Sequence, residues 1–477
     1  MKKIRVCAVS TVQTSFWGSG EGEFLKVHMP RLRELENKMG FSLFWTDHPV
    51  TDQKDAEKAV QKAKEEKADF LLVQSTTFSA GSVIIPFAQS GIPLGIWGIP
   101  EIRAAGAIPY NSFCGINMYA SIIKQYVGKD IPYKWFFGNT DDELFLERFS
   151  LTISALRAVK TLRGSRVALV GGVAPGFYDL AFDECRIMEK LGVQIFPHEF
   201  GEVKELALSY SDSEADEQLR KFQSGCVSTA KDLSATGLRN MARTYLAFRE
   251  ITEKNSYDGL AIGCWPRYRK ELGVVVCAVI GRLLEDGILT ACEGDIESLI
   301  TMMMLKEISG VMPMLMDLTC IDEKDETVLM WHCGSAPNCY ADARGVALES
   351  HYKPGSRVPG EDSVRVAGVH DMYFKSQAAT IARFSGNGSN LLAFSGDFTE
   401  KADRSFDGSR GWIGNLEMDH KPFAVRDLVE TIMTSGLQHH YAICPGRLED
   451  ALRETASWLS VKPIPAIPYS PYRKIYE

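Results

Sequence analysis

Short apolar runs alternate with amphipathic helical stretches over most of the first 300 residues, and this alternation restricts the possible folds more than any other feature. The first series of strand-like and helix-like segments covers residues 4–10, 23–40, 41–46, 52–67, 69–74 and 93–98. After a long helical stretch at 141–162, a second series covers residues 166–172, 177–192, 193–200, 202–254, 259–264, 272–286 and 288–293. Such alternation predicts parallel sheets with helices on both faces. We therefore predict two Rossmann-like α/β domains, at residues 1–163 and 164–315.

The pattern changes after about residue 315. Residues 364–397 are rich in β-branched and aromatic side chains, with a turn at 386–388. This composition is typical of antiparallel strands. Helical patterns follow at 427–435 and 448–459. We predict a third, β-rich domain at residues 316–477.

Composition and charge narrow the class of protein. The chain has 477 residues, of which 45% are hydrophobic and 24% charged, as expected for a globular protein of two to four domains. The net charge of −8 argues against a nucleic-acid surface. No apolar segment is long enough to cross a membrane. The basic start at Lys2 and Lys3 resembles a signal peptide, but the apolar stretch behind it is short and broken by Arg5. We expect a cytoplasmic protein with no membrane partner.

The eleven cysteines are scattered, and several lie in apolar runs. This distribution favours buried thiols of a cytosolic protein over a disulfide framework. No two cysteines are spaced as CxxC, which argues against a structural zinc site.

An apolar run at residues 288–293 ends on a carboxylate, Glu293, just before the helical pattern that starts at 296. A charge at the end of a buried strand is costly without a partner, and ligands bind at this end of open α/β sheets. A second acid, Asp317, follows two dozen residues later, after a Met-rich run. One helix and one strand fill that interval, so both acids could stand at neighbouring strand ends. Asp295 is expected to cap the helix.

Histidines complete a candidate metal site. His439 and His440 follow a helix stop at Gly436, and His332 ends another apolar run. Carboxylates with an imidazole suit a divalent ion such as Mn²⁺, Mg²⁺ or Co²⁺. Glu293, Asp317 and His440 are therefore candidate ligands, with His332 and His439 as possible additions. Each has an ordinary alternative: Glu293 as a structural acid, Asp317 as a solvated strand-end residue, and each histidine as a hydrogen-bonded core residue.

Together these residues resemble the L-fucose isomerase and L-arabinose isomerase superfamily. Both branches have a Glu, then Gly or Asn, then Asp before a helix, as at residues 293–295. Asp317 resembles the second acid of the fucose branch, and residues 436–440 resemble the Gly-x-(His/Asn)-His element with one extra residue. His332 falls where the arabinose branch has a His ligand, and residues 77–79 resemble its His-Thr-Phe-Ser stretch. The match follows the chain in order, but the amino-terminal half is divergent.

The resemblance implies two Rossmann-like domains followed by a β-rich, barrel-like domain, assembled into hexamers or similar homo-oligomers whose sites a neighbouring subunit completes. It also implies an aldose–ketose isomerase that acts through an enediolate. A metal ion polarises the sugar carbonyl, one carboxylate moves the C2 proton to C1, and the other shuttles the hydroxyl proton. Glu293 and Asp317 would be both ligands and acid/base groups, and His440 mainly a ligand.

The loop at residues 264–270 departs from the family pattern. It carries Arg267, Arg269 and Lys270 after Trp265-Pro266, where related sequences often have an acid or a neutral residue. A guanidinium suits a sulfonate, phosphate or carboxylate. The superfamily includes an isomerase of sulfoquinovose, a 6-sulfo aldohexose, so we predict that Arg267 and Arg269 bind an anionic sugar. The alternatives are a neutral aldose such as L-fucose or L-arabinose, with the cations paired to Glu271 or to a neighbouring subunit.

Other residues are weaker candidates for sugar binding. Gln13 follows the first strand, and Trp17 and Trp412 could stack on a sugar face, although loop and packing roles are the commoner alternatives. The turn at 171–176 lacks the G-x-G-x-x-G spacing, which argues against a nicotinamide-dependent dehydrogenase. A non-catalytic sugar-binding module would explain paired α/β domains but not the β-rich domain or the set of acids and histidines.

Overall fold

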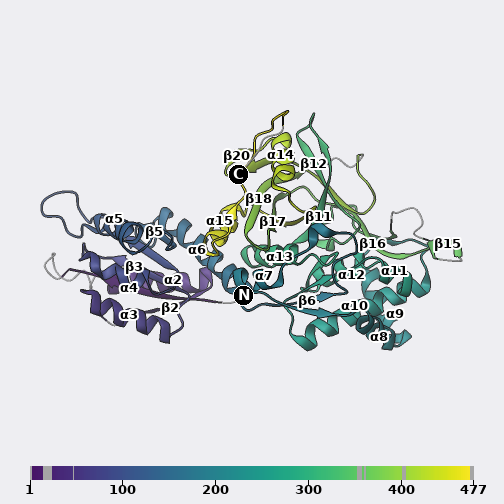
Figure 1. The fold of residues 1–477 in the computed structure, drawn as a ribbon, viewed down its shortest axis with the longest axis horizontal. Helices are drawn as coiled ribbons and strands as arrows, with labels where there is room; N and C mark the ends of the chain where they lie inside the picture. The colour runs from purple at the N-terminus through teal and green to yellow at the C-terminus, as the bar shows by residue number, and fades with distance from the viewer. Residues whose placement is uncertain are drawn as a thin grey trace. The chain divides into compact units, whose positions relative to one another are not determined.

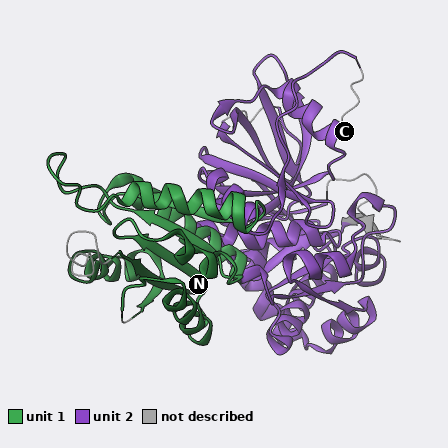
Figure 2. Ribbon diagram, turned by 60° about the vertical axis from the view of Figure 1, so that its left-hand side comes forward, with its two compact units in different colours: residues 1–160 green, residues 161–477 purple. Residues whose placement is uncertain are grey.

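The chain divides into two units, residues 1–160 and 161–477, which Figure 2 shows in different colours. The structure is a computed structural model, and it describes residues 3–13, 24–46, 48–351, 357–358, 361–399 and 404–472. Both units contain a parallel sheet, and the larger unit also contains a mixed sheet of eleven strands. The predicted mixed α/β class is thus confirmed. The arrangement as two Rossmann-like domains and a separate β-rich domain stays a prediction.

The first unit is built on five parallel strands in the order β2-β1-β3-β4-β5 (Figure 1). The strands are β1 (Ile4–Thr11), β2 (Phe41–Trp45), β3 (Phe70–Ser75), β4 (Leu94–Gly98) and β5 (Tyr133–Phe137). The helices are α2 (Met29–Met39), α3 (Gln53–Glu65), α4 (Ile84–Ala88), α5 (Ser112–Ile122) and α6 (Glu143–Leu162). Strands β1, β3 and β4 are almost entirely buried, as strands covered on both faces must be.

The second unit begins with four parallel strands in the order β10-β9-β6-β7. The strands are β6 (Arg166–Val170), β7 (Gln194–His198), β9 (Gly259–Ile262) and β10 (Leu289–Cys292). The helices are α7 (Glu184–Leu191), α8 (Phe200–Ser209), α9 (Asp212–Ser224), α10 (Ala235–Asn255), α11 (Arg267–Leu272), α12 (Cys277–Glu285) and α13 (Ile296–Ser309).

Two of the predicted helices were wrong in extent. The helix predicted at 177–192 begins only at Glu184, because Asp183 accepts a hydrogen bond from the backbone N–H of Arg186 and acts as the N-cap. The helix predicted at 272–286 begins only at Cys277, and residues 267–270, which were expected in a loop, belong to the short helix α11 instead. Helix α11 ends at Leu272, where Gly273 takes a left-handed φ of 67°, and α12 starts at Cys277.

Six strands of the mixed sheet pair in a closed ring. The order is β18-β17-β21-β11-β12-β19, and β19 pairs again with β18; every pairing is antiparallel. The ring strands are β11 (Met314–Asp322), β12 (Thr327–His332), β17 (Ala378–Ser385), β18 (Asn390–Thr399), β19 (Ser409–Met418) and β21 (His440–Pro445). The turn predicted at 386–388 joins β17 to β18, as expected.

Short strands and two helices complete this part of the chain. The remaining elements are β8 (Ser228–Thr229), β13 (Ala347–Ser350), β14 (Arg357–Val358), β15 (Glu361–Arg365), β16 (Ala367–Tyr373), β20 (Lys421–Pro422), β22 (Lys462–Pro463), α14 (Val425–Ser435) and α15 (Glu449–Trp458). Strand β13 pairs with β8, so the mixed sheet takes in a strand from the preceding α/β region.

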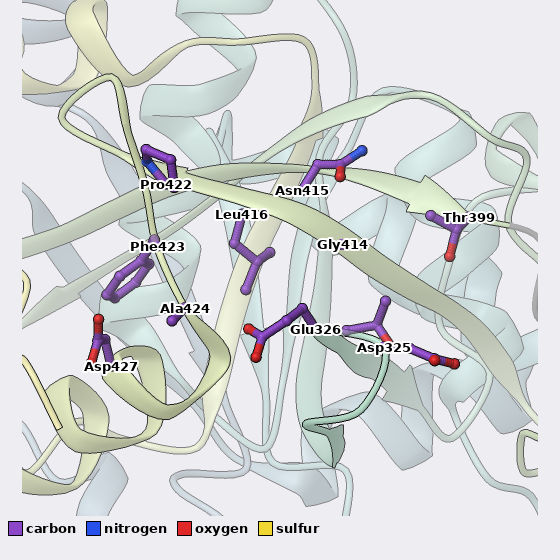
Figure 3. Close-up of a pocket in the computed structure, with 11 residues that line it drawn as sticks. Asp325, Glu326, Thr399, Gly414, Asn415, Leu416, Pro422, Phe423, Ala424 and Asp427 are labelled. Carbon is purple, nitrogen blue, oxygen red and sulfur yellow. The ribbon is translucent and has the colours of Figure 1, made fainter.

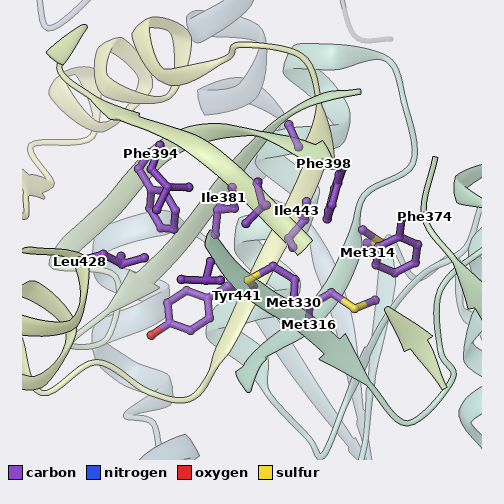
Figure 4. Packing of buried hydrophobic residues seen from close by; sticks show 14 of the residues in the cluster. Met314, Met316, Met330, Phe374, Ile381, Phe394, Phe398, Leu428, Tyr441 and Ile443 are labelled. Carbon is purple, nitrogen blue, oxygen red and sulfur yellow. The ribbon is translucent and has the colours of Figure 1, made fainter. Parts of the chain in front are cut away.

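The ring encloses an apolar core. Figure 4 shows Met314, Met316 and Met330 of β11 and β12 in one cluster with Ile381, Phe394 and Ile443 of β17, β18 and β21. These side chains are all fully buried. The alternation of such residues with residues on the other face fixes the register of the strands, because a shift by one residue would exchange the two faces.

Helix α13 joins the two sheets of the second unit. It follows β10 of the parallel sheet and packs against both β9 and β10 and against β17 and β21 of the ring. Its residues from Ile296 to Leu305 are almost all buried, so it has no polar face. The N-terminus of α13 therefore lies where the parallel sheet and the ring meet. Among the described residues, no helix has both the length and the apolar character needed to span a membrane.

The stability of this unit is expected to depend on pH because one of its histidines is buried. His370 of β16 is 2% exposed, and its Nδ1 lies 3.3 Å from the Ala336 carbonyl oxygen. Burial lowers its pKa from 6.5 to about 4. His370 is protonated at a higher pH in the unfolded chain than in the folded protein. The free energy of unfolding should therefore fall by about 3 kcal/mol as the pH drops from 6.5 to 4. Urea unfolding at several pH values should show this loss in the parent and a smaller loss in His370→Gln.

Candidate active site

Glu293 is the first residue beyond β10, and its backbone is unusual. Its φ is 60°, and that of Gly294 is 77°, so two successive residues are left-handed. A Cβ at Gly294 would lie 2.5 Å from the Gly172 carbonyl oxygen, so only glycine fits there. The Glu293 carbonyl accepts a hydrogen bond from the Ala174 N–H at 3.0 Å. The turn after β6 thus holds Glu293 in a conformation that costs about 1 kcal/mol, which is a feature of functional sites.

Strand pairing places Asp317 directly beside His440. The two residues are register partners in β11 and β21, and His440 Nε2 lies 3.6 Å from Asp317 Oδ1. The same Nε2 lies 3.6 Å from Glu293 Oε2. The structure therefore brings the three predicted ligands together. The expectation that Asp317 ends its strand was wrong, because β11 continues to Asp322 and pairs with β12 beyond that point.

A buried ion pair orients His440. Its Nδ1 lies 3.0 Å from Asp295 Oδ2, and Arg383 of β17 donates to the same carboxylate at 2.8 Å. Burial alone would raise the pKa of Asp295, but Arg383 and His440 hold it well below its usual range. A carboxylate at Nδ1 keeps the proton there and leaves the Nε2 lone pair directed at Glu293 and Asp317. Asp295 also caps α13 through the Ser298 N–H, as predicted.

His332 and His439 flank the three residues on different sides. His332 ends β12, is 1% exposed, and has a ring nitrogen within 4.8 Å of ligand atoms of Asp317 and His440. His439 lies between two acids: its Nε2 is 3.2 Å from Glu293 Oε2 and its Nδ1 is 2.6 Å from Asp179 Oδ2. Burial lowers the pKa of His439, but these two acids outweigh burial and raise the pKa to about 9. His439 is thus a cation beside Glu293 at neutral pH.

Several observations fit a divalent cation at this point. Asp317 Oδ1 and His440 Nε2 are buried and have no hydrogen-bond partner among the described residues. Burial raises the pKa of Asp317, although His332 and His440 oppose the effect. A cation between these atoms would satisfy both and stabilise the ionised carboxylate. Two carboxylates and an imidazole are a donor set for Mn²⁺, Mg²⁺ or Co²⁺.

A cavity adjoins Glu293. Its wall includes Glu293 and Arg269 together with four thiols, and the full set is Phe177, Cys264, Trp265, Arg269, Val275, Val276, Cys277, Cys292, Glu293, Cys333 and His351. Of the two arginines predicted to bind an anion, Arg269 therefore faces the cavity. Arg267 is exposed, lies over the Phe200 ring at 5.8 Å, and is not part of the wall.

Trp412, Gln13 and Trp17 were also predicted to bind the sugar. Trp412 is 6% exposed and packs against Leu329 and Trp331, which is the packing role considered for it. Gln13 belongs to the first unit, where its N–H donates to Thr77 Oγ1, and its role stays a prediction. Trp17 lies outside the described residues.

A larger pocket, of about 640 Å³, contains none of the predicted site residues. Figure 3 shows it between the β11–β12 turn, β19 and the start of α14, with Asp325, Glu326 and Asp427 among its lining residues. Two of these acids already have structural partners. Glu326 accepts from the Val425 N–H at 2.9 Å, and Asp427 accepts from the Tyr469 N–H at 2.8 Å. We therefore assign no chemistry to this pocket.

Sequence reasoning missed Arg383, Asp179 and the orienting role of Asp295. A signal existed for Arg383, because it is the single charged residue in the otherwise apolar or small strand 378–385. A lone charge in such a run needs a buried partner. Asp179 gave no local signal, since it meets His439 only through the fold.

Comparison with known proteins identifies the class of reaction. The chain is 26% identical over 417 residues to the sulfoquinovose isomerase of Priestia megaterium, a match that covers 87% of this chain and 89% of the relative. It is 26% identical to the sulfoquinovose isomerase of Alkalicoccus urumqiensis, with 81% and 83% covered. It is 23% identical to that of a Clostridium species, with 82% and 85% covered. The protein is an aldose–ketose isomerase. Its membership of the fucose and arabinose isomerase superfamily stays a prediction.

Two further comparisons add nothing to this class. No protein-family model matches the chain. Among solved structures, an ABC-transporter solute-binding protein from Agrobacterium vitis with bound α-D-tagatopyranose is 12% identical over 55% of this chain and 76% of that chain. Its TM-score is 0.17, so the likeness carries no argument about the fold or about a sugar-binding module.

Proposed function

We propose that this isomerase converts sulfoquinovose to 6-deoxy-6-sulfofructose and requires a divalent ion, Mn²⁺, Mg²⁺ or Co²⁺. One structural observation carries the metal requirement: two buried ligand atoms, Asp317 Oδ1 and His440 Nε2, lie 3.6 Å apart without a hydrogen-bond partner among the described residues. The substrate is supported by the names of the relatives and by Arg269 in the wall beside Glu293.

The residues divide the work of the isomerisation between them. When bound, the ion would act as a Lewis acid on the sugar carbonyl. Glu293 takes the proton from C2 and returns it to C1, so that the reaction passes through a cis-enediolate. Asp317 shuttles the proton between the two hydroxyl oxygens. The charged His439 keeps Glu293 ionised, and Asp295 holds His440 in the tautomer that presents Nε2. The environments of the two acids shift their pKa values in opposite directions, as two different roles require.

Arg269 is proposed to bind the sulfonate. It is the arginine that shares the cavity wall with Glu293, and a guanidinium can donate two parallel hydrogen bonds to such an anion. Lys270 is the next residue of α11, is exposed, and does not line the cavity. It therefore offers a matched control for the loss of one positive charge.

The decisive assay measures ketose formation from sulfoquinovose, L-fucose and L-arabinose after chelation and again after Mn²⁺ is restored. We expect activity on sulfoquinovose that disappears with the metal and returns with it. Arg269→Gln should lower kcat/KM for sulfoquinovose roughly 10- to 100-fold, because a charged hydrogen bond contributes about 1.5–3 kcal/mol. Lys270→Gln should behave like the parent.

Each part of the proposal has its own contrary result. Full activity in a metal-free sample would overturn the metal requirement. Faster turnover of a neutral aldose than of sulfoquinovose would overturn the substrate. An equal response of Arg269→Gln and Lys270→Gln would overturn the sulfonate contact. The homo-hexamer that the resemblance implies and the cytoplasmic location expected from the sequence also remain proposals, and light scattering of the purified protein tests the first.

A further inference from the structure

Three side chains from separate segments meet in the wall of the cavity. Cys277 begins α12, Cys333 follows β12, and His351 follows β13. Their sulfur and nitrogen atoms all lie within 4.8 Å of one another. All three line the same cavity as Glu293. The fold therefore gathers two thiols and an imidazole at one point, although no two cysteines of the chain are spaced as CxxC.

The donor atoms decide which ions this cluster can hold. Zinc binds Cys sulfur at about 2.3 Å and His nitrogen at about 2.0 Å with tetrahedral geometry, so its ligand atoms lie roughly 3.5–4 Å apart. The ligand atoms of the cluster are at most 4.8 Å apart, which exceeds those values by about 1 Å or less. Thiolates and imidazole favour thiophilic ions such as Zn²⁺ over Mg²⁺ and Mn²⁺. The oxygen-rich set of Glu293, Asp317 and His440 has the opposite preference.

We propose that Cys277, Cys333 and His351 form a second metal site, which takes a thiophilic divalent ion such as Zn²⁺, and that an ion bound there inhibits the enzyme. Three protein ligands leave a fourth position for water or another ligand. An ion in this wall occupies space beside Glu293 and Arg269, where the substrate is proposed to bind. The inhibition rests on the proposed function, whereas the binding of the ion does not.

A neighbouring pair of thiols provides the control. Cys264 Sγ lies 3.3 Å from Cys292 Sγ in the same wall, and a carboxylate oxygen of Glu293 lies within 4.8 Å of both sulfur atoms. That pair is part of the site described above. Cys264→Ser therefore removes a cavity thiol without changing the Cys277–Cys333–His351 cluster.

The first test is spectroscopic. The reduced, full-length protein is titrated with Co²⁺ in excess Mg²⁺, which occupies oxygen ligands and leaves thiolates free. We expect one equivalent of Co²⁺ to give a near-ultraviolet thiolate-to-cobalt band, which Zn²⁺ abolishes by displacement. Cys333→Ser and His351→Gln should each weaken metal binding by at least about 100-fold. Removing a residue that only hydrogen-bonds to a metal ligand lowers the affinity about 10- to 100-fold, and removal of the ligand itself should cost at least as much. Cys264→Ser should keep the band.

Two results of the cobalt titration would contradict the proposed second metal site. Absence of the band in the parent, or its survival in both Cys333→Ser and His351→Gln, would overturn the site. Circular dichroism of both variants checks that a lost band does not reflect unfolding, and two variants are used so that one that folds is enough for the test.

The second test measures the inhibition. Fractional inhibition by Zn²⁺ is measured in the Mn²⁺-loaded enzyme, with each variant compared to its own zinc-free rate on whichever aldose the parent turns over. His351→Gln should need at least about 100-fold more Zn²⁺ than the parent, in line with its loss of affinity. Equal inhibition of the two proteins would show that Zn²⁺ acts elsewhere and would overturn the inhibitory role. Failure on sulfoquinovose would overturn only the proposed substrate, since the cobalt band is independent of the sugar.

Discussion

Glu293→Gln is expected to lower kcat by about 10²- to 10⁴-fold, the range that a positioned general base contributes. The amide has nearly the same size and can still accept the hydrogen bond from His439 at the position where Glu293 Oε2 now lies 3.2 Å away. It cannot take a proton from C2. Folding should therefore persist while the chemical step fails. Steady-state rates, thermal unfolding and the metal content of the purified variant measure the three consequences separately.

A surface residue serves as the control for this substitution. Glu205 of α8 is exposed, so Glu205→Gln makes the same chemical change away from the site and should leave kcat at the parent value. A Glu293→Gln protein that is folded, loaded with metal and still substantially active would refute the role of Glu293 as the base.

Arg383→Met is expected to destabilise the protein by about 3–5 kcal/mol, because it leaves a buried carboxylate without its cation. Arg383 is fully buried and donates to Asp295, Ser298 and the His440 carbonyl, with further support from Gln438. Methionine has a similar apolar stem, so little packing is lost. Unfolding in urea at pH 7 measures the change.

The pH dependence separates this explanation from a packing defect. Burial raises the pKa of Asp295, and without Arg383 one of the two groups that oppose this effect is lost, so the carboxyl takes up a proton at a higher pH than in the parent. A protonated carboxyl is cheaper to bury. The deficit relative to the parent should therefore shrink as the pH falls from 7 toward 4. Arg220→Met, at an exposed position of α9, should cost little at any pH. A deficit that is small at pH 7, or that does not change with pH, would contradict the assignment.

Local patterns were sufficient for most of the fold. Strands β1, β2 and β10 begin or end within a residue of their predicted positions, because each is an apolar run bounded by polar or turn residues. The errors occurred where a single residue decides a boundary. Gly273 ends α11, so that α12 starts only at Cys277, and Asp183 starts α7 later than the pattern suggests. The closed ring was not visible in local patterns, since strand pairing is decided between distant segments.

The candidate site shows a similar division. Glu293, Asp317 and His440 could be selected because acids and histidines at the ends of apolar runs are unusual, and the structure brings them together. Their proposed functions await experiment. Asp179 and the cysteine cluster could not be selected, because their significance depends on contacts across the fold. Arg383 could have been selected as the lone charge of its strand, but its partner Asp295 could not be read from the sequence. Arg267 and Arg269 look alike in sequence, and only the direction that each takes from α11 distinguishes them.

Helix α13 has a consequence for how the second unit can be divided. It is buried on nearly all sides, and its apolar surface is shared between the parallel sheet and the ring of strands. A chain cut at residue 315 would deprive this helix of its contacts with the ring and would expose the surface of the ring that the helix covers. The two halves of the unit are thus expected to lose their structure together, in one cooperative transition. The candidate ligands Glu293, Asp317 and His440, which come from both sheets near the N-terminus of this helix, would keep their spacing for as long as both sheets are folded.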